Sequence, residues 1–207
     1  RDRFTDQVYE ALLLVGENRS SAADRGQALD ASVQGFYSSR RGEIVLVSDS
    51  PTPTVDRGTL VHELVHALQD QRLSLGAPTS TLDARRAQAS VIEGDANYLQ
   101  RIYERRCGTE WDCIDRPSRQ GSGGANDLNL GLFLTIYAPY ATGPEFVAAV
   151  RERGGWTAVD ALYDRFPAST EQVIHPETYP DEAPVSVTVL DRSAGEWERY
   201  DRDPAGE

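Results

Sequence analysis

Hydrophobic residues recur along this chain with the period of an α-helix in several long segments. The first runs from Asp2 to about Glu17, where apolar side chains fall three to four positions apart. Two longer segments, from about Val55 to Arg72 and from about Thr81 to Arg106, predict two further helices. Thr81 is expected to cap the second of them. The remaining helical patterns predict three shorter helices, at about Leu128–Ala138, Pro144–Arg153 and Trp156–Phe166.

Three short segments have the composition of strands instead. Val33–Tyr37 and Glu43–Ser48 flank a turn that ends in Gly42, which predicts a hairpin, and Pro184–Leu190 alternates as a third strand. The fold class predicted is therefore α+β: a mainly helical domain with a small antiparallel or mixed sheet beside the helix at 55–72. We expect one domain over 1–207. Its parts are 1–80 with the sheet, 81–180 with most of the helices, and 181–207 with a strand and an acidic tail.

The helix predicted at 55–72 carries His62-Glu63-Leu64-Val65-His66. Histidines four positions apart lie on one helix face, so both imidazoles reach one metal ion. Glu63 lies about 100° round the helix from His62, beside the metal, where a general base for an activated water belongs. The flanking residues are uncharged, which predicts a buried helix; the alternative is a pair of core histidines with hydrogen-bond partners. Zinc is the metal that best fits imidazole and carboxylate ligands with one position left for water.

A catalytic zinc needs a third protein ligand, and the helix predicted at 81–106 offers Glu93 and Asp95. Either carboxylate is able to bind the metal while the other holds a ligand histidine through its second ring nitrogen. The helical wheel places Asp95 deeper in the apolar arc than Glu93. Gly94, between them, lacks a side chain and lets another helix approach closely.

The combination of His62-Glu63-x-x-His66 with Glu93-Gly94-x-Ala96 resembles the gluzincin zinc peptidases. This resemblance implies that His62, His66 and Glu93 are the zinc ligands, that Glu63 is the catalytic base, and that Asp95 supports the ligands from behind. In gluzincins a sheet edge near the cleft binds extended peptide by strand addition, which makes the strand at Glu43–Ser48 a candidate for that edge; the alternative is an ordinary core strand.

A closer resemblance rests on three stretches: His-Ala-Leu-Gln-Asp-Gln at 66–71, Glu-Gly-Asp-Ala at 93–96, and Ser-Thr-Glu-Gln-Val-Ile-His-Pro-Glu-Thr-Tyr at 169–179. Together they are similar to a family of surface-located metallopeptidases of salt-loving archaea. In the last stretch Ser169 is expected to cap a short helix that ends before Pro176. His175 is then either a donor to the oxyanion of the reaction or a structural histidine that holds a C-terminal turn.

Charge composition indicates where such a protein works. The chain has 33 acidic and 21 basic residues, a net charge of −12, and every basic residue is arginine. A surface of this sign repels nucleic acid, so no nucleic-acid partner is expected. Acidic, lysine-free surfaces are typical of proteins adapted to high salt, although a GC-rich genome also depletes lysine.

Cys107 and Cys113 are close enough in sequence to close a small loop as a disulfide, and two unrelated thiols are the alternative. The chain has no methionine, which predicts a mature or excised piece of a longer precursor. No apolar run approaches the roughly 18 residues of a membrane span, although an anchor outside the chain is compatible with this. We therefore expect an extracellular or cell-surface protein.

The predicted activity is zinc-dependent hydrolysis of a peptide or protein substrate, with one Zn²⁺ and with Glu63 as general base. The alternative is a non-catalytic zinc-containing module of the cell surface. The two differ in the fourth metal position, which is open in a catalytic site and closed by protein in a structural one.

Overall fold

The structure is a computed structural model that describes residues 2–12, 14, 22, 35–47, 56–73, 75, 79, 81–111, 113, 130–185, 188 and 190. These residues form a mainly helical fold with one two-stranded antiparallel sheet, which confirms the α+β class. The elements in chain order are α1 (Asp2–Ala11), β1 (Gly35–Ser38), β2 (Glu43–Leu46), α3 (Arg57–Arg72), α4 (Leu82–Arg106), α5 (Leu130–Ala161), α6 (Thr170–Ile174) and the 3₁₀ helix η2 (Pro176–Thr178). The extension of one domain over 1–207 stays a prediction.

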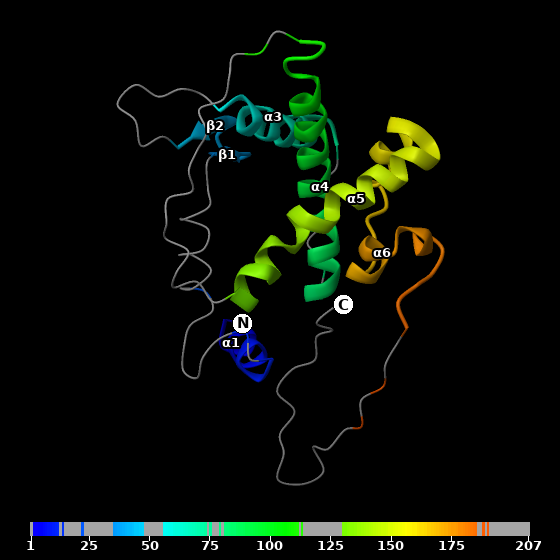
Figure 1. Ribbon diagram of the computed structural model, residues 1–207. Helices are drawn as coiled ribbons and strands as arrows, with labels where there is room; N and C mark the ends of the chain where they lie inside the picture. The colour runs from blue at the N-terminus through cyan, green and yellow to red at the C-terminus, as the bar shows by residue number, and fades with distance from the viewer. Residues whose placement is uncertain are drawn as a thin grey trace.

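Two long helices, α4 and α5, cross at the centre of the molecule (Figure 1). Gly94 of α4 and Gly143 of α5 meet at the crossing, where a Cβ on Gly143 would lie 2.8 Å from the Cα of Gly94. The predicted close approach at Gly94 is therefore confirmed, and α5 is the helix that approaches. The core packs around this crossing, and its fully or nearly fully buried members are Ala87, Val91, Phe146, Val147, Val150, Val159, Leu162, Tyr163 and Val173.

Helix α5 continues through a region where the sequence predicts a break. Pro139 and Pro144 both lie inside it, and each removes one main-chain hydrogen bond. Pro144 is fully buried beside the crossing, so tertiary packing offsets that loss. The second predicted break is confirmed: Gly154 and Gly155 have non-helical angles, and the φ of +67° at Gly155 favours glycine.

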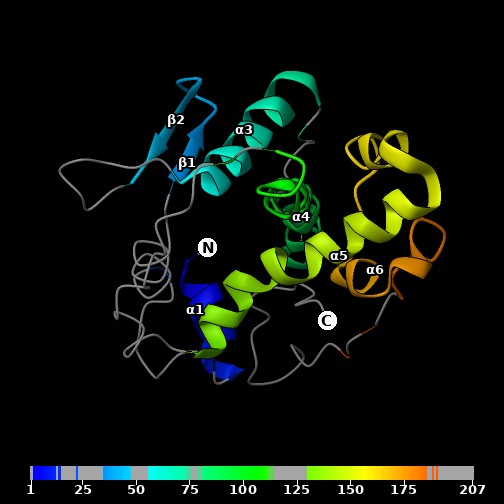
Figure 2. The ribbon, with the colours of Figure 1, turned by 45° about the horizontal axis from the view of Figure 1, so that its top comes forward.

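The hairpin and α3 form one side of the molecule (Figure 2). Gly35 pairs with Leu46 and Ser38 with Glu43, and the turn between the strands closes at Gly42, whose φ is +66°. Asp56 caps α3, because its Oδ1 accepts hydrogen bonds from the main-chain N–H groups of residues 58 and 59 at 2.8 and 3.3 Å. The hairpin packs against α3, the helix that carries His62 and His66, as predicted.

Helix α3 is less buried than its uncharged sequence predicts. Leu64 and Leu68 are each about half exposed, at 51% and 52%. The helix packs against the hairpin and against α4, and these contacts leave half of each leucine exposed. Burial is concentrated at Glu63, Val65 and Gln69.

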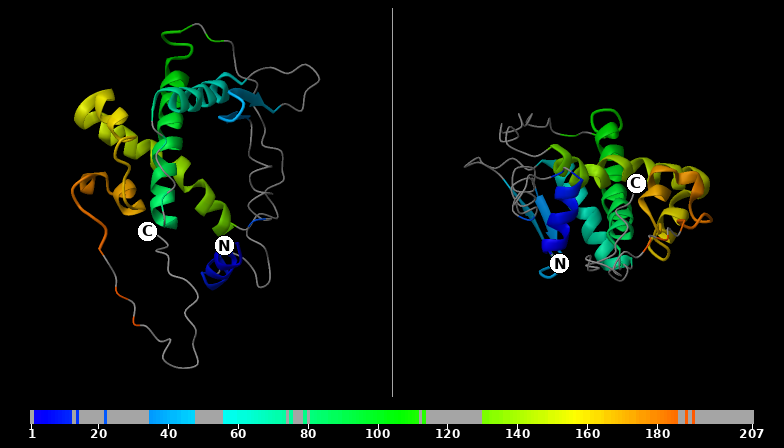
Figure 3. Two further views of the ribbon diagram at one scale, coloured as in Figure 1. Left: turned by 180° about the vertical axis from the view of Figure 1, so that it is seen from behind. Right: turned by 90° about the horizontal axis from the view of Figure 1, so that it is seen from below.

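The first turns of α4 form hydrogen bonds with α1 and α6. The first turns of α5 lie beside α1 (Figure 3), where Ile136 packs with Tyr9. Arg86 of α4 donates a hydrogen bond to the Tyr9 hydroxyl at 3.1 Å. Asp83, at the start of α4, accepts hydrogen bonds from the main chain and hydroxyl of Thr170 at 2.8 and 2.7 Å, which docks α6.

The predicted caps are confirmed at two helices. The hydroxyl of Thr81 accepts from the N–H of Ala84 at 3.1 Å, and that of Ser169 accepts from the N–H of Gln172 at 3.4 Å. The strand predicted at Pro184–Leu190 is wrong for its described residues, which have no regular structure; 186, 187 and 189 lie outside the described part. Residues 13 and 15–17 of the predicted first helix, 33–34 and 48 of the predicted strands, and 128–129 of the helix predicted at 128–138 also lie outside it.

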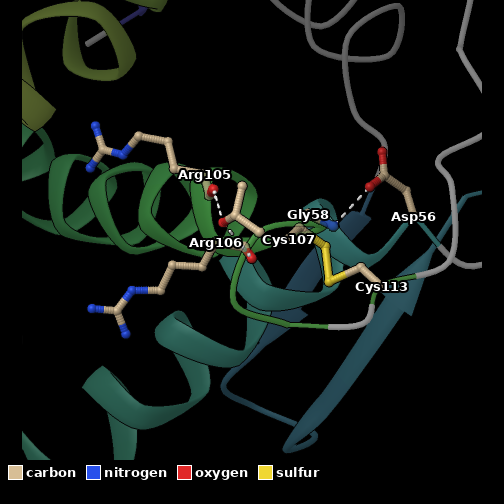
Figure 4. Close-up of a disulfide and its surroundings, with 7 residues drawn as sticks. Asp56, Gly58, Arg105, Arg106, Cys107 and Cys113 are labelled. Atoms are coloured by element: carbon tan, nitrogen blue, oxygen red, sulfur yellow. Dashed lines mark hydrogen bonds between the residues drawn. A yellow bond between two sulfur atoms is a disulfide. The ribbon is translucent and has the colours of Figure 1, made fainter.

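A disulfide joins Cys107 and Cys113 directly after α4, as predicted, with Cα atoms 5.3 Å apart. Figure 4 shows it beside Arg105 and Arg106 of the last helical turn, with Asp56 and Gly58 of the α3 start in its surroundings. Among the described residues, no helix has both the length and the apolar composition needed to cross a membrane.

Candidate metal centre

Helices α3 and α4 bring three metal-ligating side chains to one point. The Nε2 atoms of His62 and His66 are 3.0 Å apart, and Oε2 of Glu93 lies 3.4 Å from each of them. The histidines come from one face of α3, and the glutamate comes from the middle of α4, which packs against that face. Of the two carboxylates that the sequence offered as a third ligand, Glu93 is thus the one that reaches both imidazoles.

The donor set and its spacing fit a zinc ion. Atoms bound at about 2.0–2.1 Å to a tetrahedral zinc lie about 3.3–3.4 Å apart, which matches the two edges to Glu93 at 3.4 Å; the edge between the histidines, at 3.0 Å, is shorter. Oε2 of Glu93 is buried and accepts no hydrogen bond, a costly arrangement for a carboxylate oxygen unless a cation completes it. Among the described residues, His62, His66 and Glu93 form the one group of three or more such side chains able to hold a metal ion.

The electrostatics of the cluster favour a cation as well. Burial by itself raises the pKa of Glu93, but the two imidazoles lower it to about 2. Burial by itself lowers the pKa of His66, but its contact with Glu93 outweighs this and raises that pKa above its ordinary value. Glu93 is therefore an anion that faces the two ring nitrogens from a desolvated position.

Glu63 lies beside this cluster and is only 5% exposed. Burial raises the pKa of its carboxyl, while the two imidazoles and a hydrogen bond from the main chain of Tyr37 oppose that rise. Tyr37 belongs to β1, and its hydroxyl also donates to Asp70 of α3 at 2.8 Å. The hairpin therefore holds both the base candidate and the helix that carries it.

Asp95 is buried, at 6% exposure, as the helical wheel predicts, but no hydrogen bond joins it directly to either histidine ring. Gln69 lies between them: it contacts Nδ1 of His66 at 2.9 Å and donates to Oδ2 of Asp95 at 3.2 Å. No role for Gln69 is predicted from the sequence. The available signal is its position three residues after His66, on the same helix face.

Tyr140 is a second residue of the site for which the sequence predicts no role. It comes from α5, and its ring stacks on His62 with centroids 6.4 Å apart. Burial together with the charge of Glu93 raises the pKa of this hydroxyl, so it stays protonated. The rings of Phe133 and Tyr137 continue the same stack along α5. The position of Tyr140 depends on the α4–α5 crossing and has no local sequence signal.

His175 ends α6, where its side chain is about half exposed and its Nδ1 lies 3.6 Å from a carboxylate oxygen of Glu177. Helix α6 packs on α5 and on the first half of α4, away from α3 (Figures 1 and 2). The role of His175 as an oxyanion donor stays a prediction.

Three other tyrosines, on α4 and after η2, pack elsewhere. Tyr98 accepts a hydrogen bond from Arg151 at 2.9 Å, and Tyr103 lies against Trp111. Tyr179 packs edge to face on Phe146. Their contacts are those of core and surface packing.

No protein-family model, curated protein or solved structure matches this chain. The likeness to gluzincins therefore stays a resemblance, carried by the motifs of α3 and α4 and by the His-His-Glu triangle that the fold assembles.

Proposed function

We propose that this chain hydrolyses peptide bonds with one zinc ion held by His62, His66 and Glu93 and with Glu63 as general base. The observation that carries the proposal is the buried Oε2 of Glu93, which lies 3.4 Å from the Nε2 atoms of both histidines and accepts no hydrogen bond. A side chain placed in this way is stabilised by a cation between it and the rings.

When bound, zinc supplies a Lewis acid that polarises a carbonyl and lowers the pKa of a water. Glu63 accepts a proton from that water at its carboxylate and then transfers it to the amine of the leaving peptide. The burial that raises the pKa of Glu63 makes it a better base than an exposed carboxylate. The main-chain hydrogen bond from Tyr37 restrains the carboxylate during this transfer.

Tyr140 brings a hydroxyl to the cluster, because its ring stacks on His62 and the charge of Glu93 raises the pKa of its hydroxyl. A protonated hydroxyl there is suited to stabilise negative charge on the oxygen of the attacked carbonyl. His175 is the second candidate for the same task.

For the substrate we propose an extended peptide or protein segment outside the cell. The β1–β2 hairpin adjoins α3, and a strand at a sheet edge offers main-chain groups to an extended peptide. The Cys107–Cys113 disulfide is typical of an oxidising compartment, and the net charge of −12 is typical of a surface adapted to salt.

The rival function, a non-catalytic surface module, needs a metal site closed by protein. A structural zinc takes four protein ligands, whereas the cluster in the described part of the chain has three. This count supports the catalytic proposal over the rival.

The test is the variant Glu63→Gln, compared with Glu171→Gln, which changes an exposed glutamate of α6. We expect Glu63→Gln to bind zinc in the same ratio as the unaltered protein and to lose peptide hydrolysis by several orders of magnitude, and Glu171→Gln to keep both. The measurements are metal analysis and cleavage of a quenched fluorescent peptide mixture in high salt. Full hydrolysis by Glu63→Gln, or protein without zinc, would refute the proposal.

A further inference from the structure

Gln69 is the most buried polar side chain of α3, at 1% exposure. It lies three residues after His66 and faces α4. Its Oε1 is 2.9 Å from Nδ1 of His66, and its Nε2 donates to the carbonyl oxygen of Ile92 at 3.0 Å and to Oδ2 of Asp95 at 3.2 Å. All hydrogen-bonding groups of the Gln69 side chain are therefore engaged in one network.

The partners of Gln69 determine which way its amide points. The carbonyl of Ile92 has no proton and accepts only, so the NH₂ group of Gln69 faces it. The oxygen of the amide then faces His66 and accepts a hydrogen bond there. A proton on Nδ1 of His66 meets this acceptor, and in that tautomer the lone pair lies on Nε2, the atom directed at His62 and Glu93. The carboxylate of Glu93 is the competing acceptor, which favours a proton on Nε2.

The network joins α3, α4 and the turn that follows α5. Oδ2 of Asp95 on α4 accepts from Gln69 and also from the hydroxyl of Tyr163, which follows α5, at 3.0 Å. Tyr163 is 3% exposed and Asp95 6%, so neither partner exchanges freely with water. A satisfied network of this kind is rigid, because each alternative arrangement leaves a buried group without a partner.

We infer that Gln69 is a positioning residue that selects the metal-binding tautomer of His66 and fixes the orientation of its ring. Asp95 acts on His66 indirectly, because it accepts a hydrogen bond from Gln69. The inference rests on the proposed metal site, but the position of the proton on His66 is measurable without metal or substrate. Its failure and that of the proposed hydrolysis are therefore distinguishable.

The direct test is nitrogen NMR of the imidazole rings in zinc-free protein at alkaline pH, where neutral rings report their tautomer. The chain has only three histidines, so variants of His62 and His175 assign the spectrum. We expect the proton of His66 on Nδ1 in the unaltered protein. Gln69→Met, which keeps the volume but removes the acceptor, is expected to mix the tautomers and to weaken zinc affinity about 10- to 100-fold. Competition with a chromophoric chelator measures that affinity.

One further variant separates positioning from packing. Gln71→Met changes an exposed glutamine of the same helix and is expected to keep both the tautomer and the affinity. A His66 proton on Nε2 in the unaltered protein overturns the inference. So does a Gln69→Met protein that keeps the Nδ1 proton, whether or not its affinity falls. If Gln69→Met fails to fold, the unaltered protein decides the question on the same criterion.

Discussion

Gly143 of α5 contacts the backbone of Gly94 on α4, and a Cβ on either glycine would overlap with the opposite helix. Glu93 is the neighbour of Gly94, and Tyr140 lies three positions before Gly143, about one helical turn. The close crossing therefore sets the distance between Glu93, the third ligand candidate, and Tyr140, whose hydroxyl pKa is raised by the charge of Glu93. A contact between two helix backbones, made possible by the absence of side chains, therefore influences the geometry of the metal centre.

Gly143→Ala tests this dependence. The added methyl group forces the helices apart, so we expect the free energy of unfolding to fall by about 1–3 kcal/mol. Urea denaturation measures the change, and chelator competition should show weaker zinc binding in the folded variant. Ala141→Ser, at an exposed position of the same helix, is the control and should stay within about 0.5 kcal/mol. An unchanged denaturation midpoint for Gly143→Ala would contradict the close packing.

Glu93→Gln tests the identity of the third ligand. The amide keeps the shape but loses the negative charge between the two imidazoles, so zinc affinity should fall more than about 100-fold, beyond what outer residues contribute. Glu104→Gln, which lies three turns further on nearly the same face of α4, should leave the affinity unchanged.

Asp95→Asn distinguishes the two carboxylates that the sequence left open. We expect it to retain one zinc per chain in excess metal, as measured by mass spectrometry under native conditions. Loss of zinc from Asp95→Asn together with retention by Glu93→Gln would reverse the assignment.

Tyr140→Phe tests the donor to the reacting carbonyl. The variant removes one hydroxyl beside Glu93, so we expect kcat to fall about 100-fold while zinc content is unchanged. His175→Ala is the comparison, since the sequence predicts the same role for that residue. Because His175 is half exposed at the end of α6, we expect kcat to change by less than about threefold. A loss confined to His175→Ala would assign the role to His175 instead.

The salt dependence of thermal stability distinguishes two origins of the lysine-free composition, namely adaptation to high salt and a GC-rich genome. A net charge of −12 destabilises the compact state by self-repulsion, which salt screens over a Debye length of about 3 Å at 1 M. We expect the Tm to rise by several degrees, on the order of 5–10 °C, between 0.1 M and 2 M NaCl. A parallel series in sucrose controls for general solute exclusion. A Tm independent of NaCl would favour genome composition as the cause.

The hydrophobic periodicity of the sequence was sufficient to predict the two helices that carry the site. Both α3 and α4 begin and end within two residues of their predicted bounds, because capping residues and apolar spacing act locally. The break expected between 138 and 144 was wrong, since the cost of two prolines within a helix is offset by burial against α4, which no local pattern reports. The strand expected at 184–190 was wrong at its described residues, because alternation alone provides no partner strand.

At the candidate site, the sequence by itself determined the paired histidines, the neighbouring Glu63 and the two carboxylates, Glu93 and Asp95, that are candidates for the third ligand. Helical geometry makes these relationships local: His62 and His66 share a face wherever the helix packs. Only the tertiary structure decided that Glu93 meets the imidazoles, that Gln69 separates Asp95 from His66, and that Tyr140 lies beside Glu93. These contacts join residues 23 or more positions apart, and they depend on how closely α3, α4 and α5 cross, a distance set at Gly94 and Gly143 by the absence of side chains.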